Sequence, residues 1–376
     1  ISTTQENLHQ SLSLVSRITS RNLTLPILQN VLIKAQNGVL RLSTTNLEIA
    51  MSCMVRGKVE EEGEFTAPAK LFSDYISLLP PGKVQMNLKG NNLIITSEHS
   101  ETKINGISAN EFPVIPRVAE GKVFILDSLF LSQTLQTVLF AVAQTESRPE
   151  LTGVFFSFQP SPDGFRLVLA ATDSYRLAEI YLPVAKTAET NPCSLIIPAR
   201  TLLEFVRMAT APRGGMEEAE TVTITVTENQ VQFELGNSEL QSRIIEGTYP
   251  DYRQIIPSQF KTESTLSRAE FTAAIRAASL FTKSGLSDIR LEFEPAKPVT
   301  LRAADSQTGE HTAEISGQVS GIPNAMVVNY RYLLDGLQAM ADDEIVFKMI
   351  DASNPCLITP KDANESYLYL VMPIKQ

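Results

Sequence analysis

The residue types that most often carry out chemistry are scattered along this chain. The three histidines and three cysteines are His9, His99, His311, Cys53, Cys193 and Cys356. Their spacing matches no zinc site, and three isolated cysteines do not make a disulfide framework. We therefore expect no metal site, and thiols that stay reduced as they do in a cytosol.

Catalytic motifs are also missing from the sequence. It contains no glycine-rich phosphate loop, no Gly-x-Ser-x-Gly turn and no His-Glu-x-x-His helix. The acidic run Asp342-Asp343-Glu344 lies where a helix is predicted to end and a strand to begin, which favours a solvated turn over a metal cluster. We expect no catalytic residue and no cofactor.

Composition and length are those of a soluble globular protein with several domains. The chain has 376 residues, of which 43% are hydrophobic and 20% are charged. No apolar run approaches the roughly 18–20 residues that span a bilayer, and the first residues, Ile1–Gln5, do not resemble a signal peptide. These features predict a cytoplasmic protein without a membrane partner. The net charge of −10 argues weakly against nucleic acid.

Three segments follow one pattern, which indicates an internal repeat. They are Pro68–Asp74, Pro198–Glu204 and Asn329–Asp335. Each begins with a residue that favours a helix start, has a base two positions later and a carboxylate six positions later. The copies are a whole domain apart, well beyond the roughly 20–50 residues of a solenoid repeat. One domain copied three times is therefore expected.

Further elements repeat with the same period. Apolar residues at i, i+4 and i+7 predict an additional helix in each copy: Leu8, Leu12 and Val15, then Leu131, Leu135 and Val138, then Phe271, Ile275 and Ala278. Alternating segments predict strand pairs: 31–34 with 39–42, 84–88 with 93–95, 153–158 with 165–170, 222–226 with 231–235, 289–293 with 299–302, and 345–349 with 356–358. The expected fold is α+β, with two helices and antiparallel sheets in each of three domains, 1–121, 122–257 and 258–376.

The predicted helices contain few acids. They span 5–18, 68–79, 128–144, 198–210, 268–283 and 329–341, and together hold five acids and eight bases. One interpretation is a shared surface that does not repel phosphate, so that binding would be electrostatic and independent of sequence. Ordinary solvated helix faces are the alternative, and the count alone does not decide between them.

One turn differs between the copies. Equivalent turns are predicted at 44–48, 171–178 and 304–307, and only the middle one carries Ser174-Tyr175-Arg176-Leu177. A feature present in one copy is not required to build the shared fold, which suggests a function for it. Drift, with Arg176 pairing a nearby acid, is the alternative.

This turn resembles a segment of a known family. Ala171–Ala178 resembles the Ala-Thr-Asp-Gly-His-Arg-Leu-Ala segment of the bacterial DNA polymerase III β subunits, the sliding clamps. Other matching segments follow in the family's order along nearly the whole chain: 24–30, 111–113, 147–153, 247–253, 329–334 and 371–374.

The resemblance implies a fold and a function. The family has three "DNA clamp" domains per chain, and two chains form a head-to-tail homodimer, a ring of six domains. Duplex DNA passes through the ring without sequence specificity. The clamp is a non-catalytic processivity factor of the replicative polymerase. It binds replicative and other DNA polymerases, the clamp loader and repair proteins through short peptides of the Gln-x-x-Leu-Phe kind.

The family's peptide pocket can be carried over to this sequence. It corresponds to Leu151, Thr172, Ser174, Tyr175, Arg176, Leu177, Pro250, Arg253, Ile255, Asn354, Cys356, Leu370, Met372, Pro373 and Ile374. Ser174-Tyr175 replaces the common Gly-His, Gln254 stands where a second Arg is frequent, and Lys375-Gln376 replaces Arg-Leu. These departures bear on peptide preference. We expect Tyr175 to stack on an aromatic side chain of the peptide.

The family also suggests DNA and dimer contacts. The DNA-facing candidates are Arg21, Lys70, Arg148, Arg200, Asn329 and Arg331. Lys70, Arg200 and Arg331 could instead pair with the carboxylates four residues later. The dimer interface is expected to join Ile104 and Ile107 to Leu280 and Phe281, with core packing as the alternative.

Two other classes of protein are less compatible with these features. An enzyme would need titratable side chains that converge, and the scattered His and Cys residues argue against that. A relative of the clamps that binds peptides without encircling DNA would be distinguished by remaining a monomer in solution.

Overall fold

The computed structural model describes residues 1–19, 25–116, 118, 120–211, 220–282, 285–362 and 367–375. Two compact units divide these residues. The first unit contains residues 1–132, 184–190 and 200–244, and the second contains 133–183, 191–199 and 245–376. The middle repeat therefore contributes to both units. The predicted domain boundaries near 121 and 257 stay a prediction.

Six α-helices occur in the described residues, at the predicted places. They are α1 Gln5–Val15, α2 Ala69–Leu78, α3 Ser128–Gln136, α4 Ala199–Thr210, α5 Arg268–Ala278 and α6 Tyr330–Ala339. The expected stripes are buried, since Leu8, Leu135 and Phe271 are each 0% exposed. Side-chain caps start several of the helices: Thr4 accepts from the amide of Asn7 in α1, and Ser267 accepts from that of Glu270 in α5.

The helices are shorter than predicted, and this corrects the charge count. Short 3-10 turns, Leu139–Ala141 and Ser279–Phe281, stand where α3 and α5 were expected to continue. Arg17 lies beyond α1, and Lys283 lies outside the described residues. The observed helices hold six bases and five acids, so they are nearly neutral. The observed helices therefore still contain few acids, but they do not carry an excess of bases.

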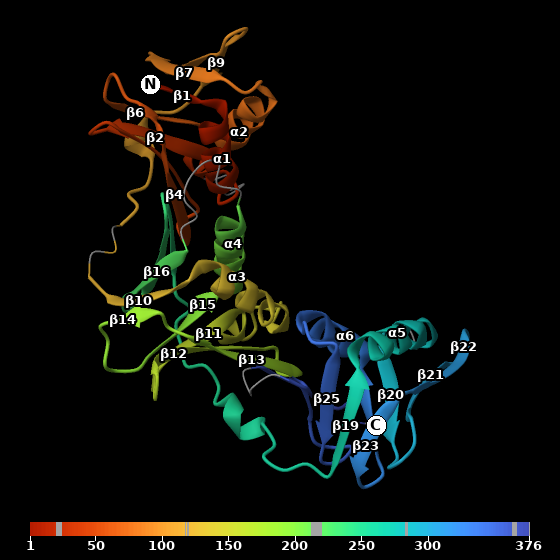
Figure 1. Ribbon diagram of the computed structural model, residues 1–376. Helices are drawn as coiled ribbons and strands as arrows, with labels where there is room; N and C mark the ends of the chain where they lie inside the picture. The colour runs from red at the N-terminus through yellow and green to blue at the C-terminus, as the bar shows by residue number, and fades with distance from the viewer. Residues whose placement is uncertain are drawn as a thin grey trace. The chain divides into compact units, whose positions relative to one another are not determined.

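The first unit contains two antiparallel sheets (Figure 1). The five-stranded sheet has the order β5 Gly57–Lys58, β1 Ser2–Thr4, β7 Lys83–Lys89, β8 Asn92–Thr96 and β9 Glu101–Asn105. The nine-stranded sheet has the order β14 Lys186–Thr187, β10 Lys122–Asp127, β16 Thr221–Val226, β17 Gln230–Leu235, β18 Ser238–Arg243, β4 Ile49–Val55, β3 Val39–Thr45, β2 Asn30–Gln36 and β6 Gly63–Pro68. The helices α1 and α2 pack side by side against strands of the first repeat.

The second unit also contains two antiparallel sheets. Its nine-stranded sheet has the order β15 Cys193–Pro198, β11 Gly153–Ser161, β12 Gly164–Thr172, β13 Arg176–Pro183, β27 Tyr367–Val371, β26 Cys356–Pro360, β25 Glu344–Met349, β19 Thr262–Ser267 and β23 Gly317–Gly321. Its four-stranded sheet has the order β22 Gly309–Ile315, β21 Val299–Asp305, β20 Asp288–Phe293 and β24 Asn324–Asn329. The helices α5 and α6 lie beside each other (Figure 1), and the rings of Phe293 and Phe347 stack 4.9 Å apart in the core.

The two nine-stranded sheets continue from one repeat into the next. In the first, β18 of the middle repeat pairs with β4 of the first repeat. In the second, β27 of the last repeat pairs with β13 of the middle repeat. The strand of the first repeat that corresponds to β18 and β27 is β9, and the strand of the last repeat that corresponds to β4 and β13 is β22. Neither has such a partner in this chain: β9 is an edge strand of the five-stranded sheet, and β22 is an edge strand of the four-stranded sheet.

Candidate peptide-binding site

The predicted turns share one side-chain hydrogen-bond pattern in all three repeats. In the first, the side chain of Asn46 accepts hydrogen bonds from the amides of Glu48 and Ile49. Asp173 does the same for Tyr175 and Arg176 in the middle repeat. Asp305 does so for Gln307 and Thr308 in the last repeat. A carboxylate or amide two residues before the amide that it binds is a common local turn former. The equivalence of the three turns is therefore confirmed.

The backbone of the middle turn is strained at one position. Ser174 has φ 77°, in the left-handed region where glycine is favoured. The Thr172 hydroxyl receives the Ser174 amide at 3.1 Å and donates to the Arg176 carbonyl at 2.6 Å. These two bonds stabilise a non-glycine residue in that conformation.

An apolar cluster lies beneath this turn. Its buried members are Leu151, Ala170, Leu177, Ile196, Tyr249, Tyr252 and Leu370, and Met372 packs against them at the surface. Antiparallel pairing places Leu177 opposite Leu370. Beyond the end of β27, the Met372 amide donates to the Tyr175 carbonyl at 2.8 Å. The C-terminal segment and the middle turn are therefore held together by backbone hydrogen bonds.

The predicted pocket residues divide into a floor and a rim. All of them lie in the second unit. The buried ones are Leu151, Thr172, Arg176, Leu177, Cys356 and Leu370. The remaining ones, which have accessible surface, are Ser174, Tyr175, Pro250, Arg253, Ile255, Asn354, Met372, Pro373 and Ile374. Tyr175 is 62% and Ile255 43% exposed, so these two offer the largest apolar surface of the rim.

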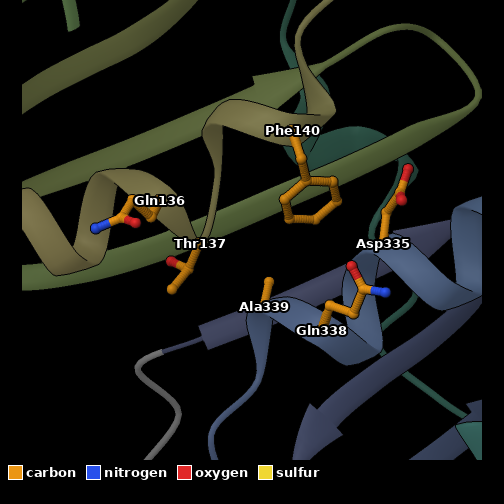
Figure 2. A pocket seen from close by; sticks show the side chains of 6 residues that line it. All are labelled: Gln136, Thr137, Phe140, Asp335, Gln338 and Ala339. Carbon is orange, nitrogen blue, oxygen red and sulfur yellow. The ribbon is translucent and has the colours of Figure 1, made fainter. Parts of the chain in front are cut away.

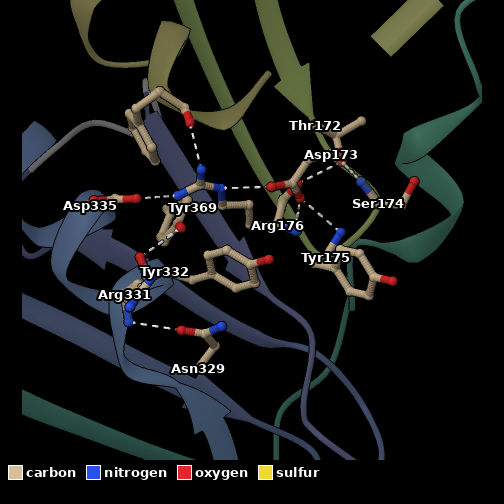
Figure 3. A network of polar contacts seen from close by, with 11 residues as sticks. Thr172, Asp173, Ser174, Tyr175, Arg176, Asn329, Arg331, Tyr332, Asp335 and Tyr369 are labelled. Atoms are coloured by element: carbon tan, nitrogen blue, oxygen red, sulfur yellow. Dashed lines mark hydrogen bonds and ion pairs between the residues drawn. The ribbon is translucent and has the colours of Figure 1, made fainter. Parts of the chain in front are cut away.

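Each of the three guanidinium nitrogens of Arg176 donates to an acceptor of this chain (Figure 3). Its Nε donates to Asp173 at 3.0 Å, and its two terminal nitrogens donate to Asp335 at 2.5 Å and to the Phe140 carbonyl at 2.7 Å. The guanidinium also lies over the rings of Phe140 and Tyr332, at 5.3 and 4.7 Å. Burial alone would lower the pKa of Arg176, but the Asp335 hydrogen bond and the neighbouring carboxylates leave this pKa above its ordinary value. Arg176 therefore pairs with acids, as the alternative interpretation of this turn proposed.

A buried carboxylate organises the opposite side of the cluster. Glu179 is 1% exposed and accepts from the hydroxyl of Tyr181 at 2.6 Å and from that of Tyr252. Arg253 lies 3.9 Å from the same carboxylate, with half of its side chain exposed. Burial, then the Glu179 hydrogen bond, raises the pKa of Tyr181 to about 12. The charge of Glu179 is thus compensated, and Arg253 keeps a free face at the rim.

Two open hollows occur in the second unit, outside the apolar cluster. One, of about 310 Å³, is lined by Gln136, Thr137, Phe140, Asp335, Gln338 and Ala339 (Figure 2). The other, of about 580 Å³, is lined by Ser157, Gln159, Pro160, Pro192, Cys193 and Ser194. Neither includes a residue of the apolar cluster around Leu177.

The DNA-facing candidates have different surroundings. Arg21 lies outside the described residues. Lys70 pairs with Asp74 at 2.6 Å, as the alternative interpretation proposed. The corresponding pairs are not formed in the other repeats, since Glu204 pairs with Arg207 and Asp335 pairs with Arg176. Arg200 and Arg331 are exposed, and neither pairs with the carboxylate four residues later.

Two further DNA candidates have structural roles. Arg148 is half exposed, pairs with Glu150 at 2.9 Å and donates to the Ser174 hydroxyl at 3.3 Å. Asn329 caps α6 by accepting from the amide of Arg331 at 2.9 Å. Asn329 therefore shapes the backbone at the start of α6, and Arg148 links Glu150 to the middle turn.

The dimer candidates are unequal. Ile104 is 3% exposed and lies in the core, so it has almost no surface left for a partner. Ile107 bridges to Thr66 and packs on the Ile27 cluster. Leu280 is 73% exposed, and Phe281 stacks on His311 with ring centroids 5.5 Å apart. Of the four predicted interface residues, Leu280 therefore has the most surface available for a partner chain.

Sequence reasoning missed an exposed apolar face on α2. Leu71 and Leu78 are 56% and 83% exposed, while Phe72 and Ile76 of the same helix are fully buried. The signal was available, because two faces of this short helix carry leucine or isoleucine and only one can face the core.

Two buried thiols, one in each unit, give a testable property of this protein. Burial raises the pKa of Cys356 from 9.0 to about 12 and that of Cys53 from 9.0 to about 11. Cys193 is only half-buried. Since the thiolate is the nucleophile, iodoacetamide at pH 8 should modify Cys193 at least about 100 times faster than the other two in the folded protein. Peptide mapping by mass spectrometry measures the three rates, and equal rates would contradict the buried positions.

The same shifts fix the sign of a pH effect. The folded state binds these two protons more tightly than the unfolded state does. Their contribution to stability is complete below pH 9.0 and is lost as the pH rises through about 11 for Cys53. In Cys53→Ala, the free energy of unfolding should therefore fall less steeply above pH 9 than in the unsubstituted protein.

Metal and membrane features can be assessed for the described part of the chain. There, no group of three or more His, Cys, Asp or Glu side chains could hold a metal ion. Asp342 and Asp343 lie between α6 and β25, and Glu344 begins β25 and pairs with Lys361. No helix within the same residues is long and apolar enough to cross a membrane.

The fold defines a class of protein built from three repeated domains, each with two helices and antiparallel sheets. Three family models match in order: DNA polymerase III beta subunit, N-terminal domain at residues 1–116, central domain at 126–251 and C-terminal domain at 253–375. The chain belongs to the DNA polymerase III beta subunit family.

Individual relatives agree with this assignment. The beta sliding clamp of Synechocystis sp. is 31% identical, over 99% of this chain and 98% of that protein. The crystal structure of the Bacillus subtilis DNA polymerase sliding clamp superposes with a TM-score of 0.91 at 27% identity, covering 100% of this chain and 98% of that one. The DNA polymerase III beta subunit of Thermotoga maritima gives a TM-score of 0.91 at 25% identity, covering 100% and 99%.

Proposed function

We infer that this chain is a sliding clamp, the processivity factor of a replicative DNA polymerase. It is a non-catalytic subunit that encircles duplex DNA and tethers its partners through short peptides. Membership of the family over all three domains supports this. The observation in the structure that carries this inference is that two sheets of the chain end in open edge strands, β9 and β22.

The sheets of one chain are incomplete in a specific way. The joins β4–β18 and β13–β27 produce two nine-stranded sheets, each shared by two repeats. The third join of the cycle would pair β22 of the last repeat with β9 of the first repeat. Within one chain these are open edges of a four-stranded and a five-stranded sheet. Open edges that pair with another chain are a common basis of assembly.

A second chain placed head to tail supplies the missing join. Its β9 would pair with β22, and a third nine-stranded sheet would form from the four- and five-stranded ones. Leu280, at 73% exposure, lies in the 3-10 turn that contacts β21 and β22, and is a residue that such a partner would cover. Two joins of this kind close a ring of six repeats.

DNA contact in such a ring needs few specific groups. The helices carry nearly balanced charge, and exposed bases such as Arg200 and Arg331 are available for phosphate. Arg21, Lys70, Arg148 and Asn329 complete the proposed set. Contacts to phosphate are blind to sequence and weaken with salt, which suits a ring that has to slide.

The partner site would be the apolar cluster and its rim. Leu and Phe side chains of a peptide would lie on Leu177, Leu370 and Met372, and the rim groups at Arg253 and Asn354 would orient the peptide backbone. Proposed partners are replicative and other DNA polymerases, the clamp loader and repair proteins. The proposed location is the bacterial cytosol.

Mass in solution tests the assembly. A dimer near twice 41.4 kDa at micromolar concentration is expected from sedimentation or light scattering. A persistent monomer would instead support a relative that binds peptides without encircling DNA.

A further inference from the structure

Glu179 is a buried carboxylate beside the proposed peptide surface, but it is not part of that surface. Its side chain is 1% exposed and lies on β13, two residues beyond Leu177 of the floor. We propose that Glu179 is a positioning residue for peptide binding, which holds the guanidinium of Arg253 in the orientation that the peptide meets at the rim. The proposal rests on the proposed peptide-binding function, because it concerns how one group of the same surface is oriented.

The carboxylate is a feature of the middle repeat alone. Strand pairing identifies the corresponding positions, because each lies opposite the third residue before the side chain that forms the turn. This position is Glu179 in the middle repeat, Ser52 in the first and Thr312 in the last. A buried charge that the other two repeats do not share is not required to build the common fold, so it calls for a local reason.

The neighbours of Glu179 compensate its charge unequally. The hydroxyls of Tyr181 and Tyr252 both donate to the carboxylate. These are neutral donors, and a buried carboxylate also needs an opposite charge close by. Arg253 supplies that charge, with its Nε 3.9 Å from the Glu179 carboxylate. Glu179 therefore draws the guanidinium of Arg253 toward the sheet.

The backbone of Arg253 is held by different contacts from its side chain. The preceding residue, Tyr252, is 6% exposed, and its ring meets those of Phe155 and Tyr249 edge-on, with centroids 6.4 and 6.1 Å apart. Tyr252 also begins the 3-10 turn Tyr252–Ile255, which carries Arg253. The Cα position of Arg253 is thus fixed by packing, whereas its half-exposed side chain depends on the carboxylate for its direction.

Arg253 also remains charged in this position. Burial alone would lower the pKa of Arg253, but the Tyr252 hydroxyl and the Glu179 carboxylate leave this pKa above its ordinary value. A charged guanidinium has several donors in a fixed plane, so it can face Glu179 with one edge and an oxygen of the peptide with another. The pair therefore presents donors to the peptide without leaving the buried carboxylate uncompensated.

A long side chain that is already oriented improves affinity, because less conformational freedom is lost on binding. Ordering one such side chain costs about two- to tenfold in affinity. Glu179→Gln keeps the size of the side chain and an acceptor for Tyr252, but it removes the charge that attracts Arg253. We therefore expect Glu179→Gln to weaken peptide binding by about two- to tenfold.

The experiment measures the affinity of a fluorescent Gln-Ala-Ala-Leu-Phe peptide for the full-length protein by anisotropy. The variants are Glu179→Gln, Arg253→Ala and the double variant that combines them. Glu239→Gln is the matched control, since Glu239 is a carboxylate of β18 in the first unit that pairs with Arg41 at 2.9 Å. Thermal unfolding and solution mass show whether each variant remains folded.

Glu179→Gln should have no further effect once Arg253 is alanine, because its role is to orient that side chain. A residue that only stabilised the fold would weaken binding equally in both backgrounds, and that result would overturn the proposal. Unchanged affinity in Glu179→Gln would overturn it as well. The control Glu239→Gln should bind the peptide with the affinity of the unsubstituted protein.

Glu179→Asp provides a second variant with the charge retained. It should keep more affinity than Glu179→Gln, and its remaining loss should also disappear when Arg253 is alanine. This variant carries the same comparison if Glu179→Gln does not fold, and a larger loss in Glu179→Asp than in a folded Glu179→Gln would contradict the role of the charge. Absence of binding by the unsubstituted protein would overturn the proposed function itself, whereas binding that does not depend on Glu179 would overturn this proposal alone.

Discussion

Replacing Met372 with aspartate should weaken binding of a Gln-x-x-Leu-Phe peptide by about 100-fold or more. Met372 packs on the cluster of Leu177 and Leu370, where the apolar side chains of the peptide would lie. An unpaired carboxylate buried there by the peptide would cost about 3 kcal/mol, and each 1.4 kcal/mol is tenfold in affinity. Anisotropy titration with the labelled peptide gives the dissociation constant.

The substitution should affect binding far more than folding. Met372 is only half-buried and follows the last strand, so the free protein can solvate the new charge. Val114→Asp is the matched control. Val114 is 90% exposed, and this substitution likewise replaces an apolar side chain with a carboxylate. Peptide affinity that stayed within threefold of the unsubstituted value would show that the peptide binds elsewhere.

Replacing Leu280 with aspartate should convert the dimer to a monomer. A side chain that is 73% exposed in one chain and covered by a partner would have to bury a carboxylate at each of two symmetric interfaces. The mass from light scattering should fall from about twice 41.4 kDa toward 41.4 kDa at micromolar concentration. Retention on circular DNA should be lost at the same time.

Ile322→Asp provides the control for this substitution. Ile322 is 51% exposed in the same repeat, and it precedes β24, at the opposite edge of the four-stranded sheet from β22. We expect that variant to remain a dimer. If Leu280→Asp remained a dimer and Ile322→Asp became a monomer, the account would be wrong, and the chains would join at the β24 edge of the sheet instead of the β22 edge.

Much of the fold could be predicted from local patterns. The i, i+4, i+7 stripe of Leu8, Leu12 and Val15 predicted α1, and alternation predicted hairpins such as β7–β8. Helix lengths were overestimated because the apolar pattern continues through the 3-10 turns Leu139–Ala141 and Ser279–Phe281. Periodicity does not mark where α-helical hydrogen bonding stops.

Contacts between repeats could not be predicted from such patterns. Nothing local to β18 indicates that it pairs with β4, and the partner of Arg176 lies in another repeat. The i+4 rule suggested that Asp335 would pair with Arg331, yet tertiary packing gave it to Arg176. The burial of Ile104 depends on how the whole sheet packs. The alternating sequence pattern around Ile104 therefore could not decide between a core position and a position in the dimer interface.

The site was partly predictable for a specific reason. Comparison of the copies singled out Ser174–Leu177, since the turn formed by Asp173 is shared and its side chains are not. The resemblance to the clamp family supplied the other pocket residues, which the sequence alone would have placed in an ordinary core. The contacts of Asp335 and Tyr332 with Arg176 required the structure, because they join the last repeat to the middle one.

The central claim is that two chains close around DNA and are held there by topology. The direct test loads the protein onto a circular plasmid, cuts the plasmid once with a restriction enzyme, and measures retention by gel filtration before and after the cut. Retention on the intact circle and release after the cut are predicted, because a ring slides off free ends. Equal retention on circular and linear DNA would contradict the account.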